Sequence, residues 1–193
     1  MKTVSFTCLN DSTREEFEYL DSLEERFRAG LPDRIIEALK RLEFTLGGYP
    51  INRLEHSLQS ATRALNNGES EEMIMAALVH DIGDDLAPWS HSEMAAAILR
   101  PFVSDKTYWI IKHHGVFQLH YYAHHCGGNP NARDAFRGSP WFEDCVHFCE
   151  EYDQNCFDPN YNWRSLSFFE PMIHRFFTNP KTADHEYTAR YGS

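Results

Sequence analysis

The stretch AALVHDIGDD, residues 76–85, places a histidine and an aspartate side by side at the end of an apolar run. Ser70 is a suitable N-cap for a helix that runs through Asp81, and its nearly all-apolar interior predicts a buried central helix. Neighbouring helix residues lie about 100° apart, so His80 and Asp81 can reach one cavity. A buried carboxylate at a helix C-terminus is disfavoured unless a cation pairs with it. The pair therefore predicts a metal site, in which the Asp81 carboxylate can bridge two ions.

The length and net charge of the chain limit the kinds of protein that it can be. With 193 residues, it is expected to form a single domain over 1–193 with its core at roughly 33–178. The net charge of −11 argues against a nucleic-acid partner. No apolar run approaches the roughly 20 residues of a membrane span, and the start of the chain lacks the apolar region of a signal peptide. We interpret five cysteines without zinc-type pairing as reduced thiols of a cytoplasmic protein.

Helical periodicity covers most of the chain and no strand pattern is convincing, so we expect an all-α fold. A first helix over 13–28 is expected to pack on the core, and the tail over 180–193 to be loose. The pattern further predicts helices over 33–45, 53–66, 70–81 and 166–177.

Local signals place the remaining helix ends. Ser90 and Glu93 fit a capping box that starts a helix at His91. Gly115 is expected to end the helix that Ser104 caps, before a further helical stretch. Ser139-Pro140 predicts the start of the next helix, with proline at its first position.

Short ligand-type side chains recur on or beside these expected helices. They offer imidazole and carboxylate donors without thiolate, a set that suits iron or manganese better than a structural zinc. Six ligands favour two ions bridged by Asp81. The candidates are His56, His80, Asp81, His91, His114 and Asp153.

Spacing leaves two of these choices open. His113 competes with its neighbour His114, and Asp144 and Asp158 compete with Asp153. The remaining histidines are interpreted as surface or hydrogen-bonded residues.

The segments RLEHSLQ (53–59), ALVHDIG (77–83) and YDQ (152–154) carry a resemblance to the HD-domain superfamily. The resemblance spans roughly residues 45–160. Within the superfamily, the chain is most similar to the branch with six ligands and a di-iron centre, which includes the phosphonate-cleaving HD oxygenases. The resemblance implies an HD-domain helical bundle with a dinuclear site in its core. It also implies a mixed-valent Fe(II)/Fe(III) pair held by the six candidates, with Asp81 as the bridge.

Within this branch, the pattern is most similar to members acting on (R)-1-hydroxy-2-(trimethylammonio)ethylphosphonate. The resemblance implies that O2 is used to cleave the carbon–phosphorus bond, with glycine betaine and phosphate as products. A partner hydroxylase would act earlier in the same pathway. The alternative is an HD phosphohydrolase, in which a metal-bound hydroxide attacks a nucleotide or phosphate ester.

Three positions depart from the related branch members, which carry basic or imidazole side chains where this chain has Asp84, Gln118 and Glu150. Asp84 or Asp85, with nearby aromatic residues, is expected to hold a trimethylammonium group, which is recognised by aromatic faces and carboxylate charge. The aromatic candidates are Tyr49, Trp89, Phe117, Tyr121 and Tyr122. The catalytic candidates are Asp84, Tyr49 and Gln118. Replacement contacts for the phosphonate are sought among Arg53, Arg63, Lys112, Asn131 and Arg133.

Overall fold

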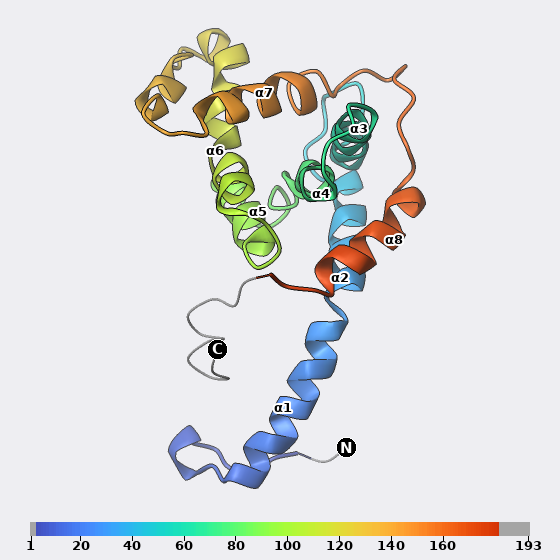
Figure 1. Cartoon of the computed structure of the whole chain (residues 1–193), viewed down its shortest axis with the longest axis vertical. Helices are drawn as coiled ribbons and strands as arrows, with labels where there is room; N and C mark the ends of the chain where they lie inside the picture. The colour runs from blue at the N-terminus through green and yellow to red at the C-terminus, as the bar shows by residue number, and fades with distance from the viewer. Residues whose placement is uncertain (1–2, 182–193) are drawn as a thin grey trace.

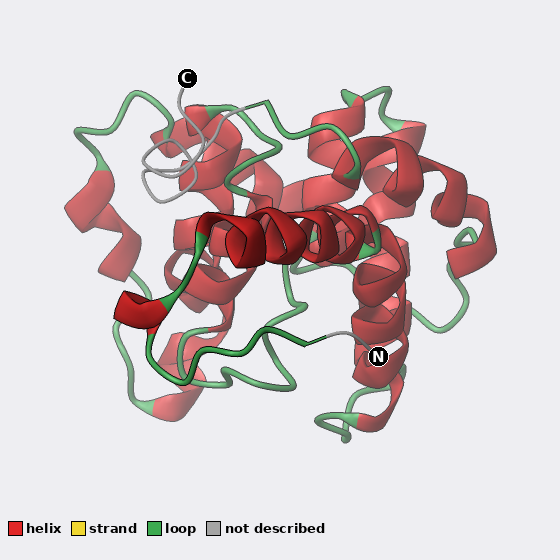
Figure 2. Ribbon diagram, turned by 90° about the horizontal axis from the view of Figure 1, so that it is seen from below, coloured by secondary structure: helices red, strands yellow, loops and turns green. Residues whose placement is uncertain are grey.

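The computed structural model describes residues 3–181, and within them it contains helices and no strand (Figures 1 and 2). The α-helices are α1 (Arg14–Ala29), α2 (Leu31–Arg41), α3 (Arg53–Asn66), α4 (Glu71–Val79), α5 (His91–Leu99), α6 (Asp105–Tyr122), α7 (Phe142–Tyr152) and α8 (Leu166–Phe177). Short 3-10 turns lie at Leu9–Asp11, Leu42–Phe44, Ala123–Cys126 and Ala132–Phe136. The expected all-α fold is confirmed.

Helix α4 is the centre of the bundle, as its apolar sequence predicted. Every residue from Ile74 to Val79 is buried. Helix α3 packs along α4, while α6 and α8 contact it from other sides (Figure 1). Burial of each large side chain, such as Met75 or Leu78, contributes about 1.5–3 kcal/mol. This packing holds the end of α4, with the His-Asp pair, inside the bundle.

Side-chain caps define the starts of several helices. Asn52 accepts a hydrogen bond from the backbone N–H of Glu55 and completes a capping box at the start of α3. Ser70 caps α4 and Ser104 caps α6 in the same way, with one bond each. The expected capping box at Ser90 does not form. The backbone of Ser90 (φ −149°, ψ 33°) departs from the extended conformation of an N-cap, and its side chain makes no cap bond.

Helix α6 runs through Gly115 to Tyr122, so the predicted helix end at Gly115 is wrong. A Cβ at this position would lie 2.7 Å from the Ser92 Oγ atom and 3.6 Å from the His91 ring. The glycine therefore allows the close packing of α5 on α6 and ends neither helix. The Ser139-Pro140 signal also misplaces a start, because α7 begins at Phe142 after a turn in which the Phe142 N–H bonds the Ser139 carbonyl.

The first helix contributes little to the core. Helix α1 contains no buried residue, and Figure 1 shows it extending from the N-terminal end of α2 away from the bundle. The predicted tail over 180–193 lies almost wholly outside the described residues. Among residues 3–181, none of the helices is long and apolar enough to cross a membrane.

Candidate metal centre

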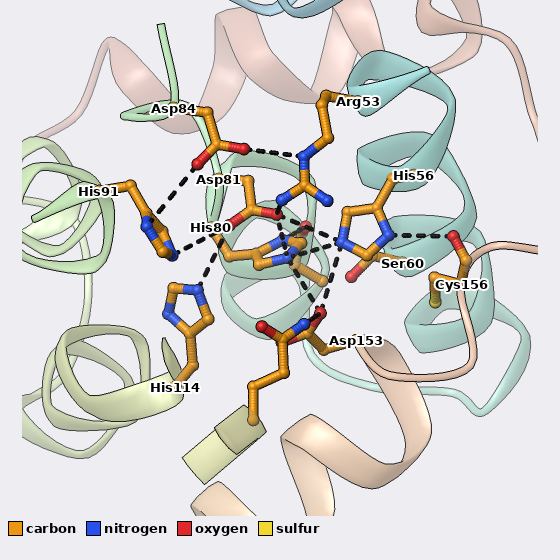
Figure 3. Close-up of polar contacts among 12 residues, drawn as sticks. Arg53, His56, Ser60, His80, Asp81, Asp84, His91, His114, Asp153 and Cys156 are labelled. Carbon is orange, nitrogen blue, oxygen red and sulfur yellow. Dashed lines mark hydrogen bonds and ion pairs between the residues drawn. The ribbon is translucent and has the colours of Figure 1, made fainter. Parts of the chain in front are cut away.

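The six candidate ligands come from five places in the chain and meet in one buried cluster (Figure 3). Five of them are at most 2% exposed, and the side chain of His91 is 25% exposed. His56 lies in the second turn of α3 and His114 in the middle of α6. His80 and Asp81 follow α4, His91 begins α5, and Asp153 follows α7. We call these six residues the His/Asp cluster.

Asp81 lies between two pairs of histidines. Its Oδ2 atom is 3.3 Å from the His56 Nε2 atom and 3.2 Å from the His80 Nε2 atom. Its Oδ1 atom is 3.4 Å from the Nε2 atoms of both His91 and His114. The two carboxylate oxygens thus face opposite histidine pairs, which is the arrangement that a bridging carboxylate requires.

Hydrogen bonds outside the cluster set the tautomers of three histidines. The Nδ1–H groups of His56, His80 and His114 donate to backbone carbonyls at 2.9, 2.8 and 2.6 Å. The acceptors belong to Cys156, Ala77 and Ile111. A neutral imidazole that donates from Nδ1 leaves the Nε2 lone pair free, and this lone pair points into the cluster.

The cluster contains acceptors that no protein donor satisfies. The Nε2 atoms of His56 and His80 lie 3.1 Å apart, although both carry a lone pair when the two imidazoles are neutral. The Oδ2 atom of Asp153 is buried and has no hydrogen-bond partner among the described residues. A metal cation would satisfy these acceptors. The ligand set contains nitrogen and oxygen donors and no thiolate, and such a set suits iron. The residues present therefore fit a metal centre.

The electrostatics also favour a cation. Burial disfavours the charged form of His80, but the Asp81 and Asp153 carboxylates outweigh it and raise the pKa of His80 well above its ordinary value. Burial likewise opposes the charge of Asp81, yet His80 and Arg53 hold the pKa of Asp81 well below its usual range. The pKa of Asp153 is lowered for the same reason, because its histidine neighbours outweigh burial. The pocket stabilises negative carboxylates and positive charge between them.

The structure resolves the choices that spacing left open. His113 lies outside the cluster, where its Nδ1–H donates to the Trp109 carbonyl. Asp144 forms an exposed ion pair with Lys106. The backbone carbonyl of Asp158 accepts a hydrogen bond from the Gln59 amide, which holds the loop after α7 against α3.

The predicted catalytic residues have different neighbours. Gln118 donates from its amide to the Oδ1 atom of Asp153 at 2.6 Å, so it orients that carboxylate. Asp84 lies against His91, with 3.7 Å between its Oδ1 atom and Nδ1, and bonds Arg53 at 2.8 Å. Tyr49 stacks on Phe157 at 4.9 Å between ring centres, and Phe157 stacks on His56 at 4.5 Å.

Several residues expected around a trimethylammonium group lie elsewhere. Trp89 is 97% exposed, and Phe117 is buried in the core. Asp85 pairs with Arg41 on the surface. Burial, with Tyr49 and Asp153 nearby, raises the pKa of Tyr122.

Sequence reasoning did not place two neighbours of the cluster. Arg53 was one of several replacement candidates, and its position three residues before His56, on the same side of the helix, was a usable signal. Phe157 carries no such signal, because a loop places it on the His56 ring.

A separate cavity of about 1200 Å³ lies between α1 and the bundle and includes none of the His/Asp cluster. It is lined in part by Phe27, Leu31, Ile98, Phe102 and Phe177. The unsatisfied acceptors of the His/Asp cluster, and not cavity size, identify the candidate site.

Comparison with known proteins supports this assignment. Residues 53–135 match the HD domain, a span that includes five members of the cluster and ends before Asp153. The chain is also 41% identical over 66 residues to the [1-hydroxy-2-(trimethylamino)ethyl]phosphonate dioxygenase (glycine-betaine-forming) of Leisingera caerulea. This alignment covers 28% of the chain and 34% of the relative, so the chain spans about a third of that protein's length. The protein thus combines an all-helical fold and an HD-domain match with a buried His/Asp cluster that can hold metal.

Proposed function

We propose that this protein is a di-iron oxygenase that uses O2 to cleave the carbon–phosphorus bond of a 1-hydroxyphosphonate. The observation that carries the proposal is the Asp81 carboxylate shared between two histidine pairs, which provides two adjoining metal subsites. The partial relative's name, a dioxygenase of a trimethylamino phosphonate, supports the reaction class. The proposed substrate is (R)-1-hydroxy-2-(trimethylammonio)ethylphosphonate, which with O2 yields glycine betaine and phosphate.

In this proposal, the residues of the cluster hold and orient the metals. His56, His80 and Asp153 form one side, where the Asp153 Oδ1 atom lies 3.4 Å from the His56 Nε2 atom and 3.7 Å from the His80 Nε2 atom. His91 and His114 form the other side, with Asp81 between the two. A mixed-valent Fe(II)/Fe(III) pair, when bound, supplies the activation of O2 and the one-electron chemistry at the substrate carbon. The backbone carbonyls that accept from the imidazole Nδ1–H groups keep the Nε2 atoms aimed at the metals.

Burial determines from which side a substrate can approach. The cluster is closed to solvent around His56, His80 and His114, while His91 keeps a partly exposed ring. The substrate is therefore proposed to enter on the side of His91 and Asp84. Exclusion of water elsewhere protects a reactive intermediate from side reactions.

Aromatic rings near the cluster are suited to the cationic end of this substrate. Tyr49 and Phe157 form a stacked pair that continues onto His56, and both Tyr49 and Tyr122 are partly exposed. A trimethylammonium group has no N–H to donate, so aromatic faces are its natural partners. We assign the cation to this aromatic group, since Asp84 and Asp85 are already paired with arginines.

The test is turnover with and without oxygen. Iron-loaded protein is mixed with the trimethylammonio hydroxyphosphonate in air and in anaerobic buffer, and phosphate and glycine betaine are measured. Oxygen-dependent release of both products in equal amounts is the expected result. The partner that supplies this substrate would be a hydroxylase, because the C1 hydroxyl must be installed first.

The HD-domain match and a buried arginine beside the cluster would also suit a phosphohydrolase acting on a phosphate ester. Phosphate release from ordinary phosphate esters without oxygen, together with no glycine betaine in air, would favour that alternative and contradict the oxygenase.

A further inference from the structure

Arg53 brings a buried positive charge to the edge of the His/Asp cluster (Figure 3). It is the first residue of α3, three residues before His56, and only 8% exposed. Its Nη2 group donates to the Oδ2 atom of Asp81, and its Nε–H donates to the Oδ2 atom of Asp84 at 2.8 Å. The guanidinium carbon lies 5.7 Å from the centre of the Tyr49 ring.

These contacts fix the orientation of the guanidinium. The first turn of a capped helix is a rigid support, and the Asn52 capping box starts α3 directly before Arg53. Both carboxylates belong to the turn that follows α4, in which the Asp84 N–H donates to the Asp81 carbonyl. Two bonds from different nitrogens leave the planar group little freedom to rotate. A buried charge of this kind is costly unless its donors are well paired.

Donors of Arg53 remain available to a ligand. A guanidinium has five N–H groups, and the contacts above use Nε and one side of Nη2. No described residue accepts from Nη1, and Nη1 is not among the fully buried polar atoms without a partner. The Nη1 group is therefore not fully buried and can donate to a ligand. Asp84 connects the same guanidinium to the partly exposed His91, where the substrate is proposed to enter.

We infer that Arg53 receives the phosphonate oxygens of the substrate and that Asp84 is its positioning residue. This inference rests on the proposed function, since the phosphonate is the anionic end of that substrate. A guanidinium matches a tetrahedral oxyanion through parallel N–H bonds, which a lysine cannot reproduce. The Arg53 group touches the bridging carboxylate, so an anion bound to it lies directly beside the metals.

The assignment changes the role expected for Asp84. Its carboxylate is paired with Arg53 and faces His91, so we do not assign it as the receptor for the cationic end. The two ends of the substrate are then separated. The anion binds Arg53 beside Asp81, and the trimethylammonium group binds the rings of Tyr49 and Phe157.

The experiment measures binding of two simple probes to the iron-loaded chain under anaerobic conditions. Methylphosphonate carries the anion alone, and choline carries the quaternary ammonium alone. Their dissociation constants are measured by calorimetry for the wild type and for the variants Arg53→Gln, Arg53→Lys and Asp84→Asn. The matched control is Arg41→Gln, which removes the neighbouring but exposed Arg41–Asp85 pair. Iron per chain is measured for every protein.

Arg53→Gln is expected to bind methylphosphonate about 10- to 100-fold more weakly, with choline affinity and iron content unchanged. Arg53→Lys is expected to bind methylphosphonate more tightly than Arg53→Gln but more weakly than the wild type, because lysine keeps the positive charge but lacks the parallel N–H donors of the guanidinium. Asp84→Asn is expected to lie between wild type and Arg53→Gln, and Arg41→Gln to match the wild type.

Three results would overturn the inference: no methylphosphonate binding by the wild type, unchanged affinity in Arg53→Gln, or an equal loss of iron in that variant. The last result would mean that Arg53 only supports Asp81. Failure of the proposed function would be a separate result. In that case no product would form in the presence of oxygen, although the affinity for methylphosphonate would still depend on Arg53.

Discussion

At the scale of single residues, Gln118 shows how a neutral side chain supports the cluster. Its amide donates to the Oδ1 atom of Asp153 at 2.6 Å. Replacement of this glutamine by leucine keeps the volume of the side chain but leaves the carboxylate free to turn. Loss of such an outer partner typically lowers metal affinity about 10- to 100-fold. We expect Gln118→Leu to lose iron at correspondingly lower chelator concentration, measured as iron per chain after dialysis.

The control for this prediction is Gln154→Leu, on the neighbouring loop. The Gln154 side-chain amide donates to the exposed Glu150 carbonyl, not to a carboxylate of the cluster. Equal chelator resistance of Gln118→Leu and the wild type would show that Asp153 is held by other contacts.

At the scale of elements, Gly83 controls how closely α5 approaches the end of α4. A Cβ on Gly83 would lie 2.6 Å from the His91 carbonyl oxygen and 2.8 Å from the His91 Cα atom. Both atoms belong to the backbone, so the start of α5 would have to shift. We expect Gly83→Ala to lower the free energy of unfolding by about 1–3 kcal/mol and to weaken iron binding on the His91 side. Denaturant unfolding and iron content measure the two effects.

Gly138→Ala is the matched control, because nothing lies within 4 Å of a Cβ at that position. It is expected to keep its iron and to gain slightly in stability, as the unfolded chain loses freedom. If the two variants behaved alike, close packing at Gly83 would not be what positions His91.

At the scale of the molecule, we expect α1 to be separable from the bundle. Helix α1 has no buried residue, while α8 buries Phe169, Ile173 and Phe177 against the core. We expect removal of residues 1–29 to leave iron per chain and the cooperative unfolding of the bundle intact. Circular dichroism during heating and metal analysis of the shortened chain check this result.

A pair of point variants tests the same contrast without truncation. Phe169→Ala should cost about 3–5 kcal/mol, because its ring is fully buried. Phe17→Ala in α1 should cost much less, since no residue of that helix is buried. Loss of iron from the shortened chain, or equal costs of the two variants, would show that α1 is part of the structural core.

Local sequence signals were sufficient for most helices. The helix over 53–66 and the last helix over 166–177 have the predicted bounds, because apolar periodicity and end signals are properties of neighbouring residues. Gly115 failed as a signal, since a glycine is required equally at a helix end and at a close contact with another helix. The neighbouring helix decides between these meanings, and it lies far away in the sequence.

The sequence by itself determined the all-helical fold, the buried central helix and the kinds of donor that surround Asp81. Tertiary structure decided which candidates meet. It selected His114 over His113 and Asp153 over its competitors, and it placed Arg53 against Asp81. The physical reason is that a helix sequence specifies which face is apolar. The rotation of each helix about its axis, and how deeply its side chains are buried, are set only when α3, α4, α5 and α6 pack together. Contacts between residues 28 or more positions apart, such as Arg53 with Asp81, exist only after that packing.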